Sequence, residues 1–237
     1  RLGHAAILEP DKSPEKALEL IQEHRVTIFA GVVSYYNVLA RLIQDGEFDI
    51  SSLRHPMTGG EPLTDETERV WLETTDVPLE QFIGTTEMLH CFVTSTRPDD
   101  TPHTGTLGHA VPGYEVAVLD PETFEPVAEG EQGLFATRGP TGTVYWNKPE
   151  HQAQVVRGGW NVFQDVVWRD ENGDFHYIAR HDEMIISSGY NISPVQVEDV
   201  LMRHESVVEC ACVPAPDPSG KRGAIVKAYV VLADNCA

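Results

Sequence analysis

The chain has 237 residues, 41% of them hydrophobic, and a formal net charge of −20 at pH 7. This length is enough for one large domain, or for one domain followed by a small one. An acidic chain lacks the basic surface that binds nucleic-acid phosphates or anionic lipids, so we expect neither a nucleic acid nor a membrane as partner. No apolar run approaches the roughly 20 residues that span a bilayer. Four scattered cysteines are too few for a disulfide framework, which indicates a cytoplasmic protein.

The first ninety residues alternate predicted helices and strands, which is typical of an α/β layer. Ser13 and Pro14 start a helix, because Ser caps the first turn and Pro fits there. The apolar run Val26–Val33 predicts a strand buried on both faces. A helix over Tyr35–Ile43 follows, then a helix that opens at Thr64, and a short strand over Leu79–Ile83.

From about Thr104 the pattern changes to short strands separated by Gly and Pro, which predicts an antiparallel meander or small barrel. These strands are expected at residues 114–120, 133–139, 162–168 and 174–179. After Asp182, a helix capped by Ser193 and strands over residues 207–213 and 224–232 indicate a small α+β unit.

Cys210 and Cys212 alternate in the first of these last two strands, which places both on one face. They could be a metal pair or buried apolar cysteines. We favour buried cysteines, because no second ligand pair stands at zinc spacing.

One candidate site follows the predicted strand that ends at Ile83. Gly84 gives a turn, and Thr85, Thr86 and Glu87 then stand at the carboxyl end of the strand, where open α/β sheets bind ligands. Hydroxyls can bind a phosphate, and a glutamate can hold Mg²⁺ beside phosphate oxygens. The same residues are also common as a helix cap.

Two further segments carry candidate binding residues. Gly59 and Gly60, before Glu61, either allow a ligand close to the backbone or form an ordinary left-handed turn. Asp165 can accept two hydrogen bonds from a ribose diol, and Arg180, across a hairpin, can brace the diol or a phosphate. The alternative for Asp165 and Arg180 is a surface ion pair.

These segments together resemble the acyl-adenylate-forming (AMP-binding) enzymes, in particular the acyl-CoA synthetase branch. The resemblance covers nearly the whole chain. It implies that Thr86 contacts the α-phosphate, that Glu87 binds Mg²⁺, and that the Ile83–Gly84 backbone flanks the adenine. It also implies that Gly59, Gly60 and Glu61 line the adenine pocket and that Asp165 and Arg180 hold the ribose. Phe163-Gln164 and Ala179 depart from the family's residues beside this pair.

The resemblance also divides the chain at Asp182, the expected hinge. Residues 1–181 are then the C-terminal part of the large AMP-binding domain, with an α/β layer and a small barrel-like region. Residues 182–237 are the hinge and a truncated small α+β domain, in which Gly189 belongs to the loop that meets coenzyme A.

The segments Met88–His90 and Asp182–Ile192 suit the 2-aminobenzoate and benzoate ligases best. His90 then lies near an aromatic acid, unless it is a structural histidine. Tyr35 forms a wall of the acyl pocket, unless it only packs in the core.

The implied function is that of an ATP-dependent carboxylic acid–CoA ligase that binds ATP, Mg²⁺ and coenzyme A. The resemblance does not decide between a monomer and a homodimer. An enzyme that loads a carrier-protein thiol and a non-catalytic nucleotide-binding module are the alternatives. The family's phosphate loop would precede Arg1 and its catalytic Lys would follow Ala237. We therefore expect the 237-residue piece alone to be inactive.

Overall fold

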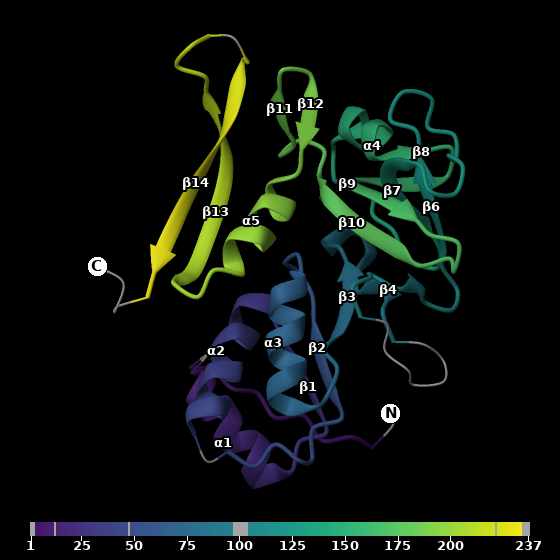
Figure 1. The fold of residues 1–237 in the computed structure, drawn as a ribbon. Coiled ribbons are helices and arrows are strands. Elements are labelled where there is room, and N and C mark those ends of the chain that lie inside the picture. Colours follow the sequence, from purple (N-terminus) through teal and green to yellow (C-terminus); the bar gives the residue numbers. More distant parts are fainter. Residues whose placement is uncertain (1–2, 12, 47, 97–103, 221, 234–237) are drawn as a thin grey trace.

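The computed structural model describes residues 3–11, 13–46, 48–96, 104–220 and 222–233 (Figure 1). The first sheet joins five strands in the order β1-β2-β3-β4-β5. They are β1 (Ile28–Gly31), β2 (His55–Thr58), β3 (Glu80–Gly84), β4 (Cys91–Thr94) and β5 (His109–Ala110). The pairs β1–β2 and β2–β3 are parallel, whereas β3–β4 and β4–β5 are antiparallel. The α/β class predicted from the sequence is confirmed.

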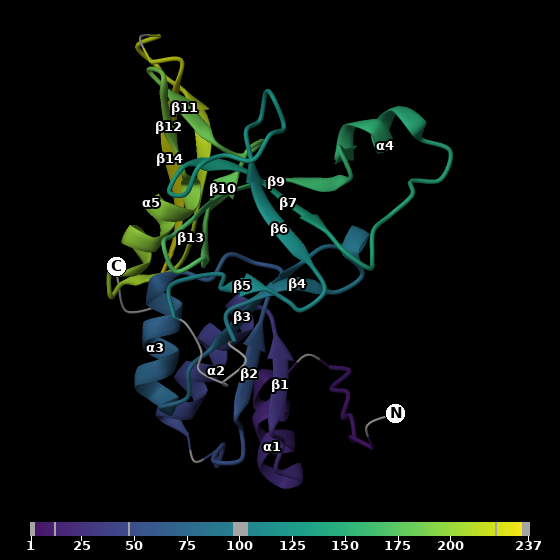
Figure 2. The ribbon, with the colours of Figure 1, turned by 90° about the vertical axis from the view of Figure 1, so that its right-hand side faces the viewer.

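Three helices alternate with the parallel strands: α1 (Pro14–His24), α2 (Val33–Asp45) and α3 (Asp65–Thr75). Figures 1 and 2 both show α2 and α3 together on one side of β1 and β2. Ser13 caps α1 and Thr64 caps α3 through hydrogen bonds from Lys16 N and Thr67 N, as the sequence predicts. Buried residues of all three helices share one core, in which the rings of Tyr36 and Trp71 meet edge to face.

The strand expected over Val26–Val33 is shorter than predicted and lies at the edge of the sheet that the described residues form. Only Ile28–Gly31 is extended, and Val33 already belongs to α2. Among the described residues β1 pairs with β2 alone, and the Ile28 side chain is 55% exposed. The prediction of burial on both faces is therefore wrong for this strand. An apolar run cannot reveal which strand of a sheet has a second neighbour.

The middle of the chain forms a second, antiparallel sheet in the order β10-β9-β7-β6, with β8 paired to β9. Its strands are β6 (Glu115–Leu119), β7 (Gln132–Arg138), β8 (Val156–Arg157), β9 (Trp160–Arg169) and β10 (Phe175–Arg180). The expected meander is thus present. Before β8 comes the short helix α4 (Pro149–Val155), and a 3₁₀ turn, η1 (Thr86–Met88), follows β3.

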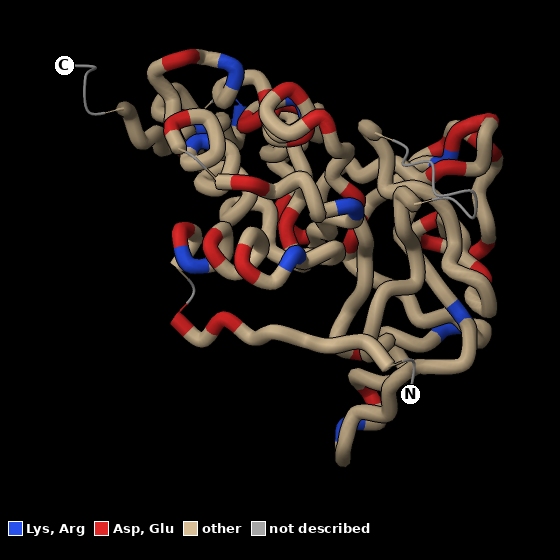
Figure 3. Tube along the Cα trace, turned by 90° about the horizontal axis from the view of Figure 1, so that it is seen from below, with Lys and Arg blue, Asp and Glu red and all other residues tan. Residues whose placement is uncertain are grey.

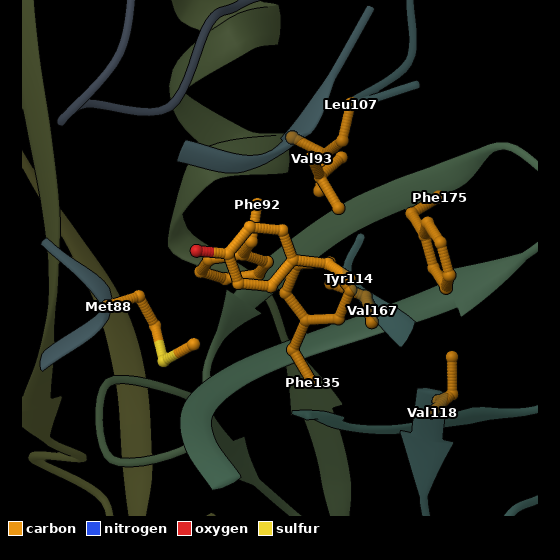
Figure 4. Packing of buried hydrophobic residues seen from close by; sticks show 9 residues of the cluster. All are labelled: Met88, Phe92, Val93, Leu107, Tyr114, Val118, Phe135, Val167 and Phe175. Atoms are coloured by element: carbon orange, nitrogen blue, oxygen red, sulfur yellow. The ribbon is translucent and has the colours of Figure 1, made fainter. Parts of the chain in front are cut away.

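One apolar cluster joins the two sheets (Figure 4). Met88, Phe92 and Val93 come from η1 and β4, whereas Phe135 and Phe175 come from the second sheet, and all are buried. Met88 is fully buried directly after Glu87, so the core fixes the backbone of the turn that carries this carboxylate.

The C-terminal part contains β11 (Ile185–Ser187), β12 (Tyr190–Ile192), α5 (Pro194–Met202), β13 (Val207–Pro216) and β14 (Ala224–Leu232). The strand pairs β11–β12 and β13–β14 are antiparallel hairpins. Cys210 Sγ approaches the Glu198 carbonyl at 3.6 Å, and Cys212 N donates to Glu198 Oε1 at 2.7 Å. The Cys210 side chain therefore lies against α5, and the Cys212 side chain is buried.

Helix α5 lies between α3, β10 and the C-terminal hairpin (Figure 1). The Ser193 hydroxyl accepts from Gln196 N and donates to the Ile178 carbonyl of β10. Asp199 Oδ1 accepts from Glu66 N, at the first turn of α3, at 3.4 Å. The Ser193 bond ties the start of α5 to the second sheet, and the Asp199 bond ties the later part of the helix to α3.

The sequence has 37 acidic and 17 basic residues. Acidic residues are spread along the described trace (Figure 3). Among the described residues, the helices are all too short or too polar to cross a membrane.

Candidate functional site

A pocket of about 250 Å³ opens beyond the carboxyl end of β3. It is lined from four separate segments, which the two sheets bring together. Thr85 and Glu87 follow β3, Arg180 ends β10, and the remaining residues come from the β7–β8 connection and from β9. These remaining residues are Thr143, Tyr145, His151, Val155, Asn161, Val162, Phe163, Gln164 and Asp165. Four of the residues singled out in the sequence, Thr85, Glu87, Asp165 and Arg180, thus share one pocket.

Glu87 is held in this pocket by a side chain that is far away in the sequence. The Tyr145 hydroxyl donates to Glu87 Oε1 at 2.6 Å. This hydrogen bond stabilises the carboxylate and lowers the pKa of Glu87, and it raises the pKa of Tyr145 to about 12. Glu87 is therefore ionised at neutral pH, which is the state that binds a cation.

Asp165 and Arg180 are cross-strand partners in the β9–β10 ladder. Burial raises the pKa of Asp165, and the nearby Arg180 charge acts against this rise. The Arg180 guanidinium donates to both carboxylate oxygens of Asp182, each at 3.0 Å, and lies 3.4 Å from Glu183 Oε1. The ion pair between Arg180 and Asp182 therefore joins the pocket to the expected hinge residue.

The turn after β3 forms a helix cap and also contributes to the pocket. Thr85 Oγ1 accepts from Met88 N at 3.3 Å and so caps η1, and Thr85 also lines the pocket. Thr86 is exposed. A side chain at Gly84 would bring its Cβ to 2.6 Å from the His90 carbonyl oxygen, so the turn requires glycine at this position. Ile83 packs against the cluster that joins the two sheets.

Gly59, Gly60 and Glu61 do not line this pocket. A Cβ on Gly59 would lie 2.7 Å from the Phe82 ring and carbonyl oxygen, so this glycine allows β2 and β3 to pack closely. Glu61 accepts from Ser34 N at 2.8 Å and from Ser34 Oγ at 3.2 Å, at the start of α2. All three residues follow β2, the parallel neighbour of β3.

His90 and Tyr35 have defined neighbours outside the pocket lining. The Tyr114 hydroxyl lies 3.1 Å from His90 Nε2 and 2.6 Å from Thr141 Oγ1. Tyr35 is half-buried and stacks on Phe29 at 6.1 Å between ring centroids.

The expected coenzyme A loop and hinge lie in turns after β10. Gly189 has φ +83° in the β11–β12 hairpin turn. Asp182 is exposed, in the turn between β10 and β11.

Sequence reasoning missed Tyr145, together with Thr143, His151 and Asn161. The signal available was an aromatic pair, Tyr145-Trp146, in a loop immediately before a helix that starts at Pro149. Trp146 is 93% exposed, whereas Tyr145 turns inward to Glu87. A sequence does not reveal which member of such a pair points into a site.

The donor set in the pocket matches what Mg²⁺ takes when it is bound together with phosphates. Such an ion uses one or two protein carboxylates and several water or phosphate oxygens. Glu87 supplies one ionised carboxylate, and the Thr85 hydroxyl lies beside it. Among the described residues, no group of three or more His, Cys, Asp or Glu side chains could hold an ion alone. The residues therefore fit a magnesium ion that arrives with a nucleotide.

The chain matches two models of known protein families. The family described as AMP-binding enzyme matches residues 1–146, and the AMP-binding enzyme C-terminal domain matches residues 196–237. The chain belongs to the AMP-binding enzyme family.

Three similar proteins are acid–CoA ligases. The chain is 35% identical over 217 residues to the benzoate–CoA ligase of Thauera aromatica, covering 90% of this chain and 40% of that protein. It is 33% identical over 237 residues to a long-chain-fatty-acid–CoA ligase of Bacillus subtilis (strain 168), covering 98% of this chain and 41% of that protein. The chain superposes on the crystal structure of the anthranilate CoA ligase AuaEII in complex with anthranoyl-AMP with a TM-score of 0.87 at 32% identity. The match covers 98% of this chain and 45% of that chain. The chain thus spans less than half the length of these relatives.

Proposed function

We propose that the protein containing this chain is an ATP-dependent carboxylic acid–CoA ligase that acts through an acyl-adenylate. The observation that carries the proposal is the gathering of Thr85, Glu87, Asp165 and Arg180 around one pocket beyond β3. These residues offer a hydroxyl, an ionised carboxylate, a diol acceptor and a guanidinium, which are groups that can bind a nucleotide.

In the first step, the substrate carboxylate attacks the α-phosphorus of ATP and pyrophosphate leaves. Asp165 accepts hydrogen bonds from the ribose hydroxyls, and Arg180 braces the ribose or the α-phosphate. Thr85 and Thr86 donate to phosphate oxygens. A magnesium ion held by Glu87 would neutralise charge on the phosphate oxygens of the leaving pyrophosphate.

The adenine is expected at the ends of β2 and β3, between the Gly59–Glu61 segment and the Ile83–Gly84 backbone. The parallel pairing of these strands supports this proposal, because it brings both segments to the same edge of the sheet. Gly59 packs on Phe82. Its proposed contribution to the adenine site is therefore to let the two strands approach closely, and not to contact the adenine itself.

In the second step, the thiol of coenzyme A attacks the acyl carbonyl and AMP leaves. We propose that residues 182–237 rotate about Asp182 between the two steps, and that the turn at Gly189 meets coenzyme A. The exposed position of Asp182 between β10 and β11 supports a pivot at this residue.

For the acid, we propose an aromatic carboxylate such as benzoate or 2-aminobenzoate, with His90 and Tyr35 near its ring. The benzoate and anthranilate ligases among the relatives support this choice. The fatty-acid ligase is nearly as similar, at 33% identity, so the choice of acid needs a direct assay. The proposed place of action is the cytoplasm, and a homodimer is compatible with the proposal.

The test uses the full-length protein that contains this chain. Acid-dependent exchange of pyrophosphate into ATP and formation of a CoA thioester are measured with benzoate, 2-aminobenzoate and a medium-chain fatty acid. We expect both activities, with the aromatic acids preferred. Exchange without consumption of CoA would favour a carrier-protein thiol as acceptor. Nucleotide binding without any exchange would favour a non-catalytic module, and preference for the fatty acid would overturn the aromatic assignment.

A further inference from the structure

The hydrogen bond between Tyr145 and Glu87 connects two segments that are 58 residues apart. Tyr145 stands in the loop between β7 and α4, whereas Glu87 stands in η1, directly after β3. The oxygen–oxygen distance of 2.6 Å is in the range of a hydroxyl bound to a charged carboxylate.

The loop around Tyr145 is itself fixed. Tyr145 N donates to Gln152 Oε1 at 2.8 Å, and Gln152 Nε2 donates to the Thr143 carbonyl at 3.1 Å. The Tyr145 ring meets the His151 ring edge to face at 4.4 Å between centroids. The start of α4 thus holds both the backbone and the ring of Tyr145.

A second link ties the same loop to the same turn. The Tyr114 hydroxyl lies within hydrogen-bond distance of both Thr141 Oγ1 and His90 Nε2. Gly139 allows the loop to pass close to Tyr114, because a Cβ there would be 2.4 Å from the Tyr114 ring. The loop from Gly139 to Tyr145 therefore runs beside η1 with an anchor at each end.

We infer that Tyr145 is a positioning residue for the Glu87 carboxylate in the binding of a magnesium–nucleotide complex. The phenol binds one carboxylate oxygen and so orients the group, while the other oxygen is left for the cation. The inference rests on the proposed function, in which Glu87 is the protein's carboxylate ligand. Residues that orient a metal ligand in this way typically contribute a factor of about 10 to 100 to metal affinity.

The test measures binding and not turnover, with the full-length protein and the non-hydrolysed analogue α,β-methylene-ATP. Calorimetry gives the Kd of the analogue with MgCl₂ present and with EDTA present. In Tyr145→Phe we expect the Kd with Mg²⁺ to rise about tenfold and the Kd in EDTA to stay unchanged. Tyr229→Phe, which changes an exposed tyrosine of β14, should alter neither value.

A double-mutant cycle separates positioning of Glu87 from a general effect on the loop. In a Glu87→Gln background, Tyr145→Phe should cause no further loss of Mg²⁺-dependent affinity. An equal loss with and without Mg²⁺, or the full loss in the Glu87→Gln background, would overturn the inference. If Glu87→Gln loses the Mg²⁺ dependence but Tyr145→Phe does not, the inference alone fails. If the wild-type protein binds the analogue neither with Mg²⁺ nor in EDTA, both the inference and the proposed function fail.

Discussion

At the scale of single residues, the pocket contains carboxylates in two different environments. Glu87 has its pKa lowered by the Tyr145 hydroxyl, whereas burial raises the pKa of Asp165. An ionised group suits a cation, and a partly desolvated group suits a neutral diol. The different surroundings therefore support different roles for the two residues.

Replacing Asp165 tests the ribose role. In the full-length protein, Asp165→Asn should weaken AMP binding about tenfold or more, because hydrogen bonds to a charged acceptor contribute about 1.5–3 kcal/mol. Equilibrium binding of AMP measures this loss. Asp45→Asn, at the exposed end of α2, should leave AMP affinity unchanged. Equal affinities for Asp165→Asn and wild type would contradict the role.

Glu68 should make stability depend on pH. Its side chain is buried in α3, where it accepts from Gly105 N at 2.8 Å, and burial raises its pKa to about 7. A raised carboxyl pKa means that the folded state binds the proton more tightly than the unfolded state does. Its stabilising contribution is complete below 4.5, the ordinary pKa of a glutamate, and is lost as the pH rises through about 7.

Thermal unfolding between about pH 5 and about pH 8 measures this effect. The Tm of Glu68→Gln should fall less than that of wild type as the pH rises. Glu129→Gln, in an exposed turn, should follow the wild-type curve. Parallel curves for Glu68→Gln and wild type would show that the buried carboxyl does not titrate in this range.

At the scale of elements, two serine caps with the same sequence pattern have different surroundings. Ser13 and Ser193 each precede a proline and each accept from the backbone N–H three residues later. Only the Ser193 hydroxyl also donates to a carbonyl of another element, that of Ile178 in β10, at a fully buried position. The second cap therefore also attaches its helix to the sheet.

Alanine substitutions distinguish the two caps. Ser13→Ala should lower the free energy of unfolding by about 1 kcal/mol, the usual cost of a lost cap. Ser193→Ala should cost about 1–3 kcal/mol more, because the buried Ile178 carbonyl loses its donor. Chemical denaturation of the full-length protein measures both values. Equal losses would mean that the bond to Ile178 contributes nothing to stability.

At the scale of the whole molecule, the turn at Asp182 is the expected boundary between two moving parts. Proline at this position would hold φ near −65° and so restrict rotation. In the full-length protein, Asp182→Pro should slow thioester formation by about tenfold or more while adenylate formation changes little, because only the second step requires the rotation. Rates of pyrophosphate exchange and of thioester formation separate the two steps.

The matched control for the hinge is Asp182→Ala. It removes the carboxylate that pairs with Arg180 but leaves the backbone free to rotate. It should therefore not slow the second step selectively. Equal loss of both half-reactions in Asp182→Pro would identify Asp182 as a structural residue and not as a pivot.

Local signals in the sequence determined most of the elements and part of the site. Caps such as Ser13, Thr64 and Ser193 act within one helical turn, so the sequence shows where these helices begin. The motif that ends at Glu87 and the spacing from Asp165 to Arg180 identified residues that line one pocket. These features depend on neighbours along the chain or across a single hairpin, and a pattern can therefore show them.

The tertiary structure decided the features that depend on contacts between distant segments. Within the described part of the chain, β1 pairs with one strand only, although its apolar sequence resembles that of a central strand. Gly59, which follows β2, packs on Phe82 of β3. Tyr145 reaches Glu87 only because the second sheet folds against η1 and β4 through a shared core. Hydrogen bonding acts over a few ångströms, so its partners are fixed by the packing of the two sheets and not by the spacing of residues along the chain.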